Sequence, residues 1–129
     1  MLTVEGLPVW ANDDACRVWR ELYDSPELLA EVLAADEPEM GLQKRLRTRY
    51  PDDVVRTALI LRDARKRAAG KFTHAAAMWF DRVNVEQATA EAVARHKAQR
   101  FDGRVWDLCC GIGGDALAVR ASKKLRSDE

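Results

Sequence analysis

The sequence is poor in the residues that would build a cross-linked or membrane-spanning protein. It has three cysteines, and two of them, Cys109 and Cys110, are adjacent, so they form neither a disulfide framework nor a Cys-x-x-Cys metal pair. No apolar run approaches the ~20 residues that a membrane-spanning helix needs. Residues 1–10 carry Glu5 and lack the basic start of a signal peptide. These absences favour a protein of the reducing cytoplasm.

The chain also lacks a net charge, but the two signs are unevenly distributed. Residues 1–43 carry a net charge of −8, residues 44–71 a net charge of +7, and residues 72–129 a net charge of +1. An acidic segment therefore precedes a basic one. The basic residues, which we call the basic belt, are Lys44, Arg45, Arg47, Arg49, Arg62, Arg65, Lys66, Arg67 and Lys71. This belt either contacts the phosphates of RNA or is a solvated surface that pairs with the acidic segment.

Hydrophobic periodicity predicts a helical first part. Helices are expected over residues 9–23, from Pro26 onward, over residues 39–49, and from Pro51 to Gly70. A short helix from Thr73 and another from Asn84 or Thr89 to Gln99 follow. We therefore predict a helical N-terminal domain over residues 1–70 and a second domain over residues 71–129.

Residues 105–118 carry the clearest chemical signal. Val-Trp-Asp-Leu-Cys at 105–109 predicts a buried strand, three glycines follow at 111, 113 and 114, and a helix is expected from Asp115 onward. Glycine allows positive φ and a close approach of the backbone to a ligand. Asp107 stands inside the expected strand, where a purely structural strand prefers an apolar residue. A strand, a glycine turn and a helix in this order form a nucleotide-binding unit of α/β folds.

The run Asp-Leu-Cys-Cys-Gly-Ile-Gly-Gly-Asp at 107–115 resembles the first motif of class I S-adenosylmethionine-dependent methyltransferases. The Cys-Gly-x-Gly-Gly form is most similar to the RNA-directed group that includes trimethylguanosine synthase, and to bacterial methyltransferases with a THUMP-like domain. Residues 71–98, with Trp79, Phe80, Gln87 and Thr89, also resemble the stretch that precedes this motif in the group. The resemblance covers about residues 65–120.

The resemblance implies S-adenosyl-L-methionine as the cofactor and a Rossmann-like fold. It implies that Asp107 holds the amino group of the cofactor by a charge-assisted hydrogen bond. The candidate cofactor-binding residues are Asp107, Cys109, Gly111, Gly113, Gly114, Asp115, Phe80, Gln87 and Thr89. No catalytic residue is identified.

Several of these residues have a second, structural interpretation. Phe72, Trp79 and Phe80 either line the cofactor or a nucleobase, or pack in a core. Gln87 and Thr89 either contact the cofactor or cap a helix. His74 and His96 lack nearby ligand partners in the sequence, so we predict no metal site.

A dinucleotide is the rival ligand of the glycine turn. Gly111 to Ala116 also fits G-x-G-x-x-A, and Asp128 stands near the distance at which that fingerprint expects an acid. The intervening residues 120–126 are basic and polar rather than strand-like. Asp107 inside the expected strand favours S-adenosylmethionine.

The expected fold is a mainly α N-terminal part followed by the first β-turn-α unit of a truncated Rossmann-like α/β methyltransferase fold. We interpret the chain as an N-terminal fragment of an S-adenosylmethionine-dependent methyltransferase that acts on RNA, and we expect it to be inactive or weak on its own. A complementing fragment would carry the rest of the sheet. The alternative is a small helical nucleic-acid- or protein-binding module with a vestigial glycine loop.

Overall fold

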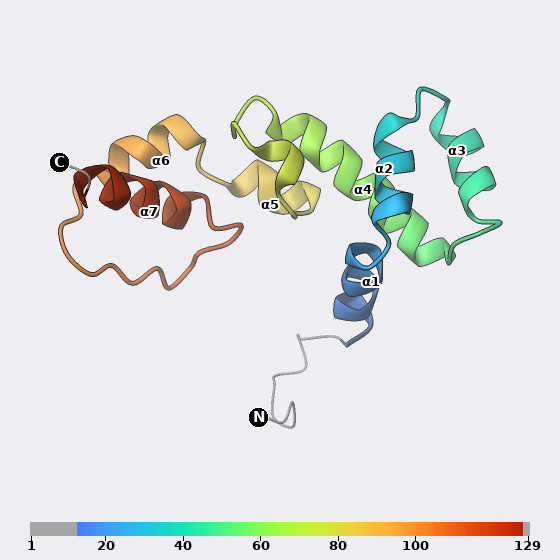
Figure 1. Cartoon of the computed structure of the whole chain (residues 1–129), viewed down its shortest axis with the longest axis horizontal. Coiled ribbons are helices and arrows are strands. Elements are labelled where there is room, and N and C mark those ends of the chain that lie inside the picture. Colours follow the sequence, from blue (N-terminus) through green and yellow to red (C-terminus); the bar gives the residue numbers. More distant parts are fainter. Residues whose placement is uncertain (1–12, 128–129) are drawn as a thin grey trace. The chain divides into compact units, whose positions relative to one another are not determined.

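A computed structural model describes residues 13–127, and this range consists of helices and irregular segments (Figure 1). The helices are α1 (Asp13–Tyr23), α2 (Pro26–Ala34), α3 (Glu39–Leu46), α4 (Asp52–Ala68), the 3₁₀ helix η1 (Ala75–Ala77), α5 (Arg82–Gln87), α6 (Glu91–Ala98) and α7 (Gly114–Ser127). The predicted mainly helical character is confirmed. No helix within residues 13–127 has the length and apolar character to cross a membrane.

The chain divides into two compact units, and the division falls inside α4, between Arg62 and Asp63. This finding does not test the predicted domains, 1–70 and 71–129, which stay a prediction. In the first unit, α1 to α4 bury one apolar cluster: Leu22, Leu28, Val32, Leu42, Leu46, Val54, Val55, Ala58, Leu59 and Leu61. Each fully buried leucine or valine contributes about 1.5–3 kcal/mol relative to an exposed one.

The start of α2 is defined by Pro26 and by the residue before it, Ser25. Pro26 occupies the first turn as expected, because its fixed φ suits that position. Ser25, however, makes no side-chain hydrogen bond to the first turn, and its hydroxyl instead donates to the Glu21 carbonyl at 2.8 Å. Ser25 therefore ties α2 back to α1.

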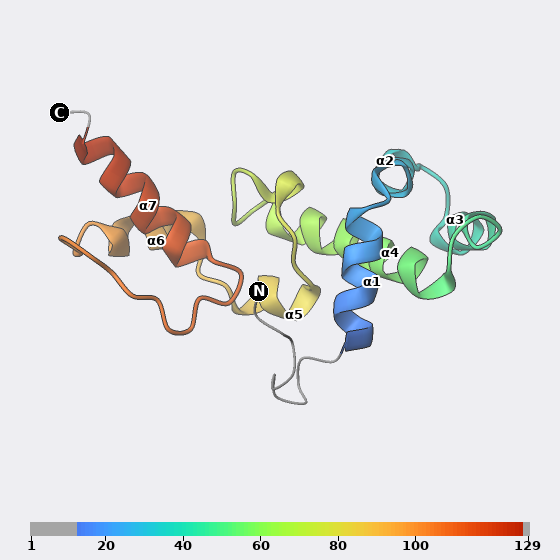
Figure 2. The same cartoon turned by 60° about the horizontal axis from the view of Figure 1, so that its bottom comes forward.

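The second unit has two smaller apolar clusters. One contains Ala64 and Ala68 of α4 with Phe72, Ala75, Phe80 and Val85. The other joins α6 to α7 through Ala94, Ala98 and Ala118. Figures 1 and 2 show α6 and α7 side by side, and small alanines at the contact let two helices approach closely.

The helix expected from Asn84 or Thr89 to Gln99 is two helices in the structure. The Asp81 side chain accepts a hydrogen bond from the Asn84 N–H at 2.8 Å and so caps α5. Ala88 and Ala90 then have extended backbone, which separates α5 from α6.

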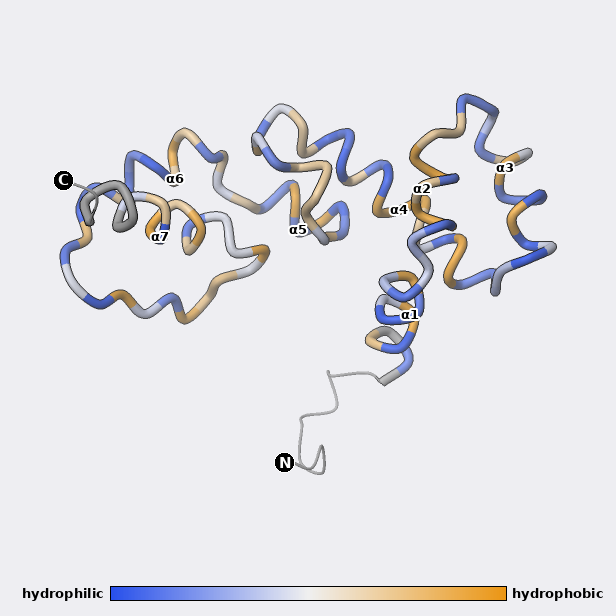
Figure 3. Tube along the Cα trace, in the orientation of Figure 1, coloured by the Kyte–Doolittle hydropathy of each residue, from blue (hydrophilic) through white to orange (hydrophobic). Residues whose placement is uncertain are grey.

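The expected buried strand at residues 105–109 is not formed, and within residues 13–127 the structure contains no strand. Trp106 and Leu108 are 80% and 89% exposed, so the prediction of burial is wrong for them. The physical reason is that a strand needs a hydrogen-bonding neighbour. The neighbouring helices α6 and α7 use their own backbone groups within the helix, so only their side chains face this segment. In Figure 3 this segment runs outside the two helices with mixed polar and apolar residues.

Candidate functional site

The glycine turn is closed by backbone hydrogen bonds on both sides. The Gly113 N–H donates to the Cys110 carbonyl at 2.7 Å, which closes a β-turn over Gly111 and Ile112. The Leu117 N–H donates to the Gly113 carbonyl at 2.9 Å, which starts α7. Gly111 has φ +50° and Gly113 has φ +79°, so both occupy the region that favours glycine. The predicted glycine turn and the helix after it are therefore present.

Gly114 serves a different purpose from the other two glycines. A Cβ added at Gly114 would lie 3.2 Å from Cε1 of Phe72 and 3.6 Å from the Thr89 carbonyl oxygen. A Cβ at Gly111 or Gly113 would meet no atom within 4 Å. Gly114 thus lets α7 approach the Phe72 cluster, while Gly111 and Gly113 face open space.

Asp115 is the anchor of the turn. The Lys97 ammonium of α6 lies 2.8 Å from both oxygens of the Asp115 carboxylate. The Thr89 hydroxyl donates to Asp115 Oδ2 at 3.3 Å, and Lys97 Nζ also donates to the Thr89 hydroxyl oxygen at 3.3 Å. An acid in the first turn of a helix also suits the positive end of the helix dipole. These contacts hold the start of α7 against the end of the α5–α6 connection.

A polar cleft of about 290 Å³ lies over this anchor. Six of the nine candidate residues line it: Gln87, Thr89, Cys109, Gly111, Gly114 and Asp115. Asn84, which the sequence suggested only as a helix start, lines it as well. Thus the structure brings residues from before α6 and residues from before α7 to one place.

A second, larger and mainly apolar cleft of about 740 Å³ adjoins the first. It lies among α6, α7 and residues 101–109 of the irregular segment between them, and its lining includes Asp107, Cys109, Asp115, Phe101 and Trp106. Cys109 and Asp115 line both clefts. The Asp107 carboxylate is exposed and accepts a hydrogen bond from the Cys109 N–H at 3.2 Å.

Two candidate residues line neither cleft. Phe80 is buried in the cluster with Phe72, which is the packing role that the sequence left open for it. Gly113 contributes its backbone conformation instead. The guanidinium carbon of Arg65 lies over the Trp79 ring, 5.6 Å from the ring centroid, in a cation–π contact. Arg65 Nε also donates to the Met78 carbonyl at 2.9 Å.

Most of the basic belt has protein partners. Arg45 pairs with Glu31 and Glu37, Arg49 pairs with Glu31 at 2.5 Å, and Arg62 pairs with Glu39 at 3.1 Å.

Two further members of the belt also contact the protein. Arg47 pairs with Asp52, and the Lys71 ammonium donates to the carbonyls of Val85, Glu86 and Ala88 at 2.8, 3.0 and 3.4 Å. The ion pairs of Arg45, Arg49 and Arg62 favour the interpretation in which the basic belt pairs with the acidic segment, while Arg47 and Lys71 contact other parts of the chain.

Sequence reasoning did not find Lys97. Its partner Asp115 is 18 residues away, and the sequence between them contains an irregular segment, so no helical or strand period links the two. The sequence around Lys97 offers one indication of its role, its position in the last turn of α6. Basic residues are common in the last turn of any helix because of the helix dipole, so this position does not single out Lys97.

Comparison with known proteins found two relatives. Both come from Mycobacterium tuberculosis, one from strain CDC 1551 / Oshkosh and one from strain ATCC 25618 / H37Rv, and each is named an uncharacterized S-adenosylmethionine-dependent methyltransferase. Each is 39% identical over 85 residues, which cover 58% of this chain and 23% of the relative. The chain thus spans about a quarter of the length of the curated relatives it matches. No protein-family model and no solved structure matches the chain. The similarity supports the methyltransferase part of the interpretation, and it carries no information on RNA.

Proposed function

We propose that this chain carries the S-adenosylmethionine-binding turn of a class I methyltransferase. The observation that supports the proposal most is the gathering of Gln87, Thr89, Gly111, Gly114 and Asp115 around one polar cleft. The sequence pattern alone points to these residues, although it contains no information on the distances between them. The name of the two mycobacterial relatives adds independent support.

The residues present fit such a cofactor in three respects. The turn has two glycines with positive φ and open space above them. The N-terminal N–H groups of α7 have no partners within an α-helix and can donate to a ligand carboxylate. The Asp107 carboxylate is exposed and makes no ion pair within residues 13–127, so it can accept a hydrogen bond from a ligand ammonium.

The cofactor supplies an activated methyl group on a sulfonium sulfur. The residues of this chain would bind and orient the cofactor. Asp107 would hold its ammonium group, the backbone of the glycine turn would lie along it, and Gln87 and Thr89 would stand at the rim of the cleft. In this proposal Lys97 is a positioning residue, because it acts through Asp115. We expect weak binding and no robust methyl transfer by the chain alone, since no paired strand supports the turn within residues 13–127.

Calorimetric titration of the full chain with S-adenosylhomocysteine tests this proposal. Asp107→Asn keeps an acceptor for the Cys109 N–H but removes the charge, so the affinity should fall about tenfold or more. Asp107→Ala should abolish measurable binding. Asp36→Asn, an exposed acid in the α2–α3 connection, is the matched control and should bind as the unchanged chain does. Binding that is the same in all four proteins would refute the role of Asp107.

We also propose RNA as the methyl acceptor, on the family resemblance alone. The basic belt does not carry this proposal, because within residues 13–127 only the side chains of Lys44, Lys66 and Arg67 of the belt make no hydrogen bond or ion pair. The alternative, a nucleic-acid-binding module, predicts an RNA affinity that falls steeply with salt and is unchanged by Asp107→Ala. RNA binding that weakens in Lys44→Ala/Lys66→Ala/Arg67→Ala, with no binding of S-adenosylhomocysteine, would favour that alternative.

A further inference from the structure

Arg65 of α4 is a buried cation that has no acidic partner within residues 13–127. It is 8% exposed. Its Nε donates to the Met78 carbonyl at 2.9 Å, and its guanidinium carbon lies 5.6 Å from the centroid of the Trp79 ring. These two contacts leave the Nη1 and Nη2 groups without a hydrogen bond in the described part of the chain. The N–H donors of these two groups are therefore available to a ligand.

The neighbouring Arg62 shows what Arg65 lacks. Arg62 stands one turn earlier in α4, is buried to a similar degree, and pairs with Glu39 at 3.1 Å. Arg65 has a neutral carbonyl in place of such a carboxylate. Burial lowers the pKa of the Arg65 guanidinium, because the interior of a protein disfavours the charged form. A buried cation without an anion is costly, so an anionic group of a ligand would stabilise it.

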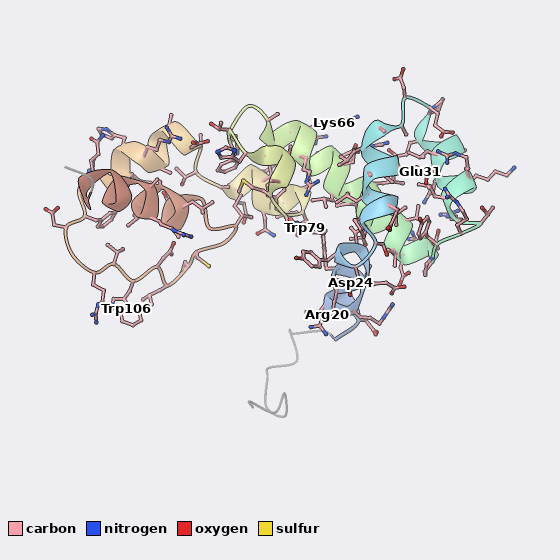
Figure 4. All side chains as sticks on the ribbon, in the orientation of Figure 1. Arg20, Asp24, Glu31, Lys66, Trp79 and Trp106 are labelled. Atoms are coloured by element: carbon pink, nitrogen blue, oxygen red, sulfur yellow. The ribbon has the colours of Figure 1, made fainter. Side chains whose placement is uncertain are left out.

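Trp79 places an aromatic surface beside this cation. It lies between η1 and α5 (Figure 4) and is 37% exposed, although its ring also contacts the Arg65 guanidinium. Guanidinium groups bind phosphates, and accessible aromatic rings stack on the bases of single-stranded nucleic acids. The two groups side by side therefore match the two parts of an unpaired nucleotide.

One apolar cluster joins this pair to the glycine turn. The cluster around Phe72 contains Ala64 and Ala68 of α4. Met78 and Ile112, a residue of the glycine turn, pack against it. The cluster therefore fixes the buried cation relative to the turn, and a ligand bound there would be held at a fixed position relative to the proposed cofactor site.

We propose that Arg65 and Trp79 bind one nucleotide of single-stranded RNA, with the phosphate at the Nη groups of Arg65 and the base against the exposed part of Trp79. The inference rests on the proposal that RNA is the methyl acceptor, and it names a place where that acceptor is held. A guanidinium can donate two parallel hydrogen bonds to one phosphate. A single strand is required, because the bases of a duplex are stacked on each other.

An acidic peptide is a poorer occupant of this site than a nucleotide. Its carboxylate would neutralise Arg65 but would leave the exposed surface of Trp79 in water. A nucleotide covers both groups, since every base has an aromatic face.

Fluorescence anisotropy of a labelled oligouridine, titrated with the full chain at several salt concentrations, tests this inference. Arg65→Met and Trp79→Leu should each weaken binding about tenfold or more. Arg65→Met should also reduce the slope of the logarithm of the binding constant against the logarithm of the salt concentration by about 0.7, the value expected for one phosphate contact on a single strand. Trp79→Leu should leave that slope unchanged, since it removes no charge.

Lys66→Met and Tyr23→Leu are the matched controls. Lys66 follows Arg65 in α4 and is exposed (Figure 4), so its substitution removes the same charge from the same helix. Tyr23 is an exposed aromatic residue of α1 in the other unit. Both variants should bind the oligouridine as the unchanged chain does.

Urea unfolding of Arg65→Met separates binding from a structural role. Replacement of a buried cation that lacks an anion by an apolar side chain should leave the unfolding midpoint unchanged or raise it. If Arg65 served mainly to hold the Met78 carbonyl, the midpoint should fall, because that carbonyl would lose its donor. A lower midpoint in Arg65→Met would therefore overturn the proposal.

Three results of the binding experiment would also overturn it. These are an unchanged affinity in both site variants, a loss in Lys66→Met as large as that in Arg65→Met, and an oligoglutamate that binds with the same dependence on Arg65 and Trp79. The last result would assign the site to an acidic peptide.

The outcome is separable from that of the proposed function. RNA binding that is insensitive to both site variants would refute this site and leave RNA as a candidate acceptor. Absence of any RNA binding would refute the site and the acceptor together. Neither result bears on the Asp107-dependent binding of S-adenosylhomocysteine, which is measured without RNA.

Discussion

At the scale of single residues, the three glycines before α7 have two different functions. Gly111 and Gly113 are required by backbone conformation, because their φ values are positive and nothing crowds them. Gly114 is required by packing, since its missing side chain makes room for the ring of Phe72. The sequence shows three glycines in four positions but does not distinguish these two reasons.

Gly113→Ala should therefore destabilise the chain through backbone strain alone. A residue with a Cβ at φ +79° is expected to cost about 1–2 kcal/mol. The measurement is urea unfolding followed by circular dichroism. Gly70→Ala is the control, because Gly70 has no positive φ and no atom within 4 Å of the added Cβ. An equal effect of the two substitutions would contradict the strain argument.

At the scale of helices, α5 shows how tertiary contacts stabilise a very short helix. With six residues, α5 is too short to be stable by itself. The Asp81 side chain caps its first turn, and the Lys71 ammonium satisfies carbonyls at its last turn. A positive charge at a helix C-terminus is also favoured by the helix dipole.

Lys71→Met should remove the second cap while keeping most of the side-chain volume. We expect a loss of about 1 kcal/mol, because exposed caps and charges at helix ends contribute of that order. Hydrogen exchange at the α5 amides is the direct measurement, and these amides should exchange faster. Lys66→Met, a change of the same kind in α4 at a lysine with no recorded partner in the described range, should leave α5 unchanged. Equal exchange in both variants would show that Lys71 does not cap α5.

At the scale of the whole molecule, the first unit is organised by charge as well as by its apolar cluster. Glu31 of α2 accepts hydrogen bonds from Arg45 and from Arg49, which follow it by 14 and 18 residues. The hydrogen bond from Arg45, and then that from Arg49, hold the pKa of the Glu31 carboxyl below its ordinary value of 4.5. The acidic and basic segments of the sequence are therefore partners in the fold.

This pKa predicts a dependence of stability on pH. A carboxyl whose pKa is lower in the folded state stabilises the fold at pH values above its unfolded pKa, and this contribution is lost as the pH falls through the folded pKa. The free energy of unfolding should consequently decrease below about pH 4.5. In Glu31→Gln that decrease should be smaller.

Urea unfolding at a series of pH values measures the effect. Glu27→Gln is the control, because Glu27 lies on the same helix and has no recorded ion pair in the described part of the chain. The same slope in Glu31→Gln and in the unchanged chain would show that the arginine pairs do not contribute.

The local pattern of residues was sufficient to predict most helices and the glycine turn. Apolar residues at helical spacing indicated α1 to α4, and the glycines at 111, 113 and 114 indicated the turn and the start of α7. These features depend on contacts between residues that are close in the sequence. A helix satisfies its own backbone, so its position can be predicted from the residues that it contains.

The features that sequence reasoning missed depend on distant partners. Residues 105–109 have the composition of a strand, but whether a strand forms is decided by a neighbour with free backbone groups, and the described part of the chain provides none. Lys97 pairs with Asp115, and Arg45, Arg49 and Arg62 of the basic belt pair with acidic residues, because the fold brings residues far apart in the sequence to hydrogen-bonding distance. The amino-acid sequence by itself determined the helices and the turn, through short-range contacts. Only the tertiary structure decided which charges are paired and which backbone groups form no hydrogen bond within the described residues, because both depend on what each group meets across space.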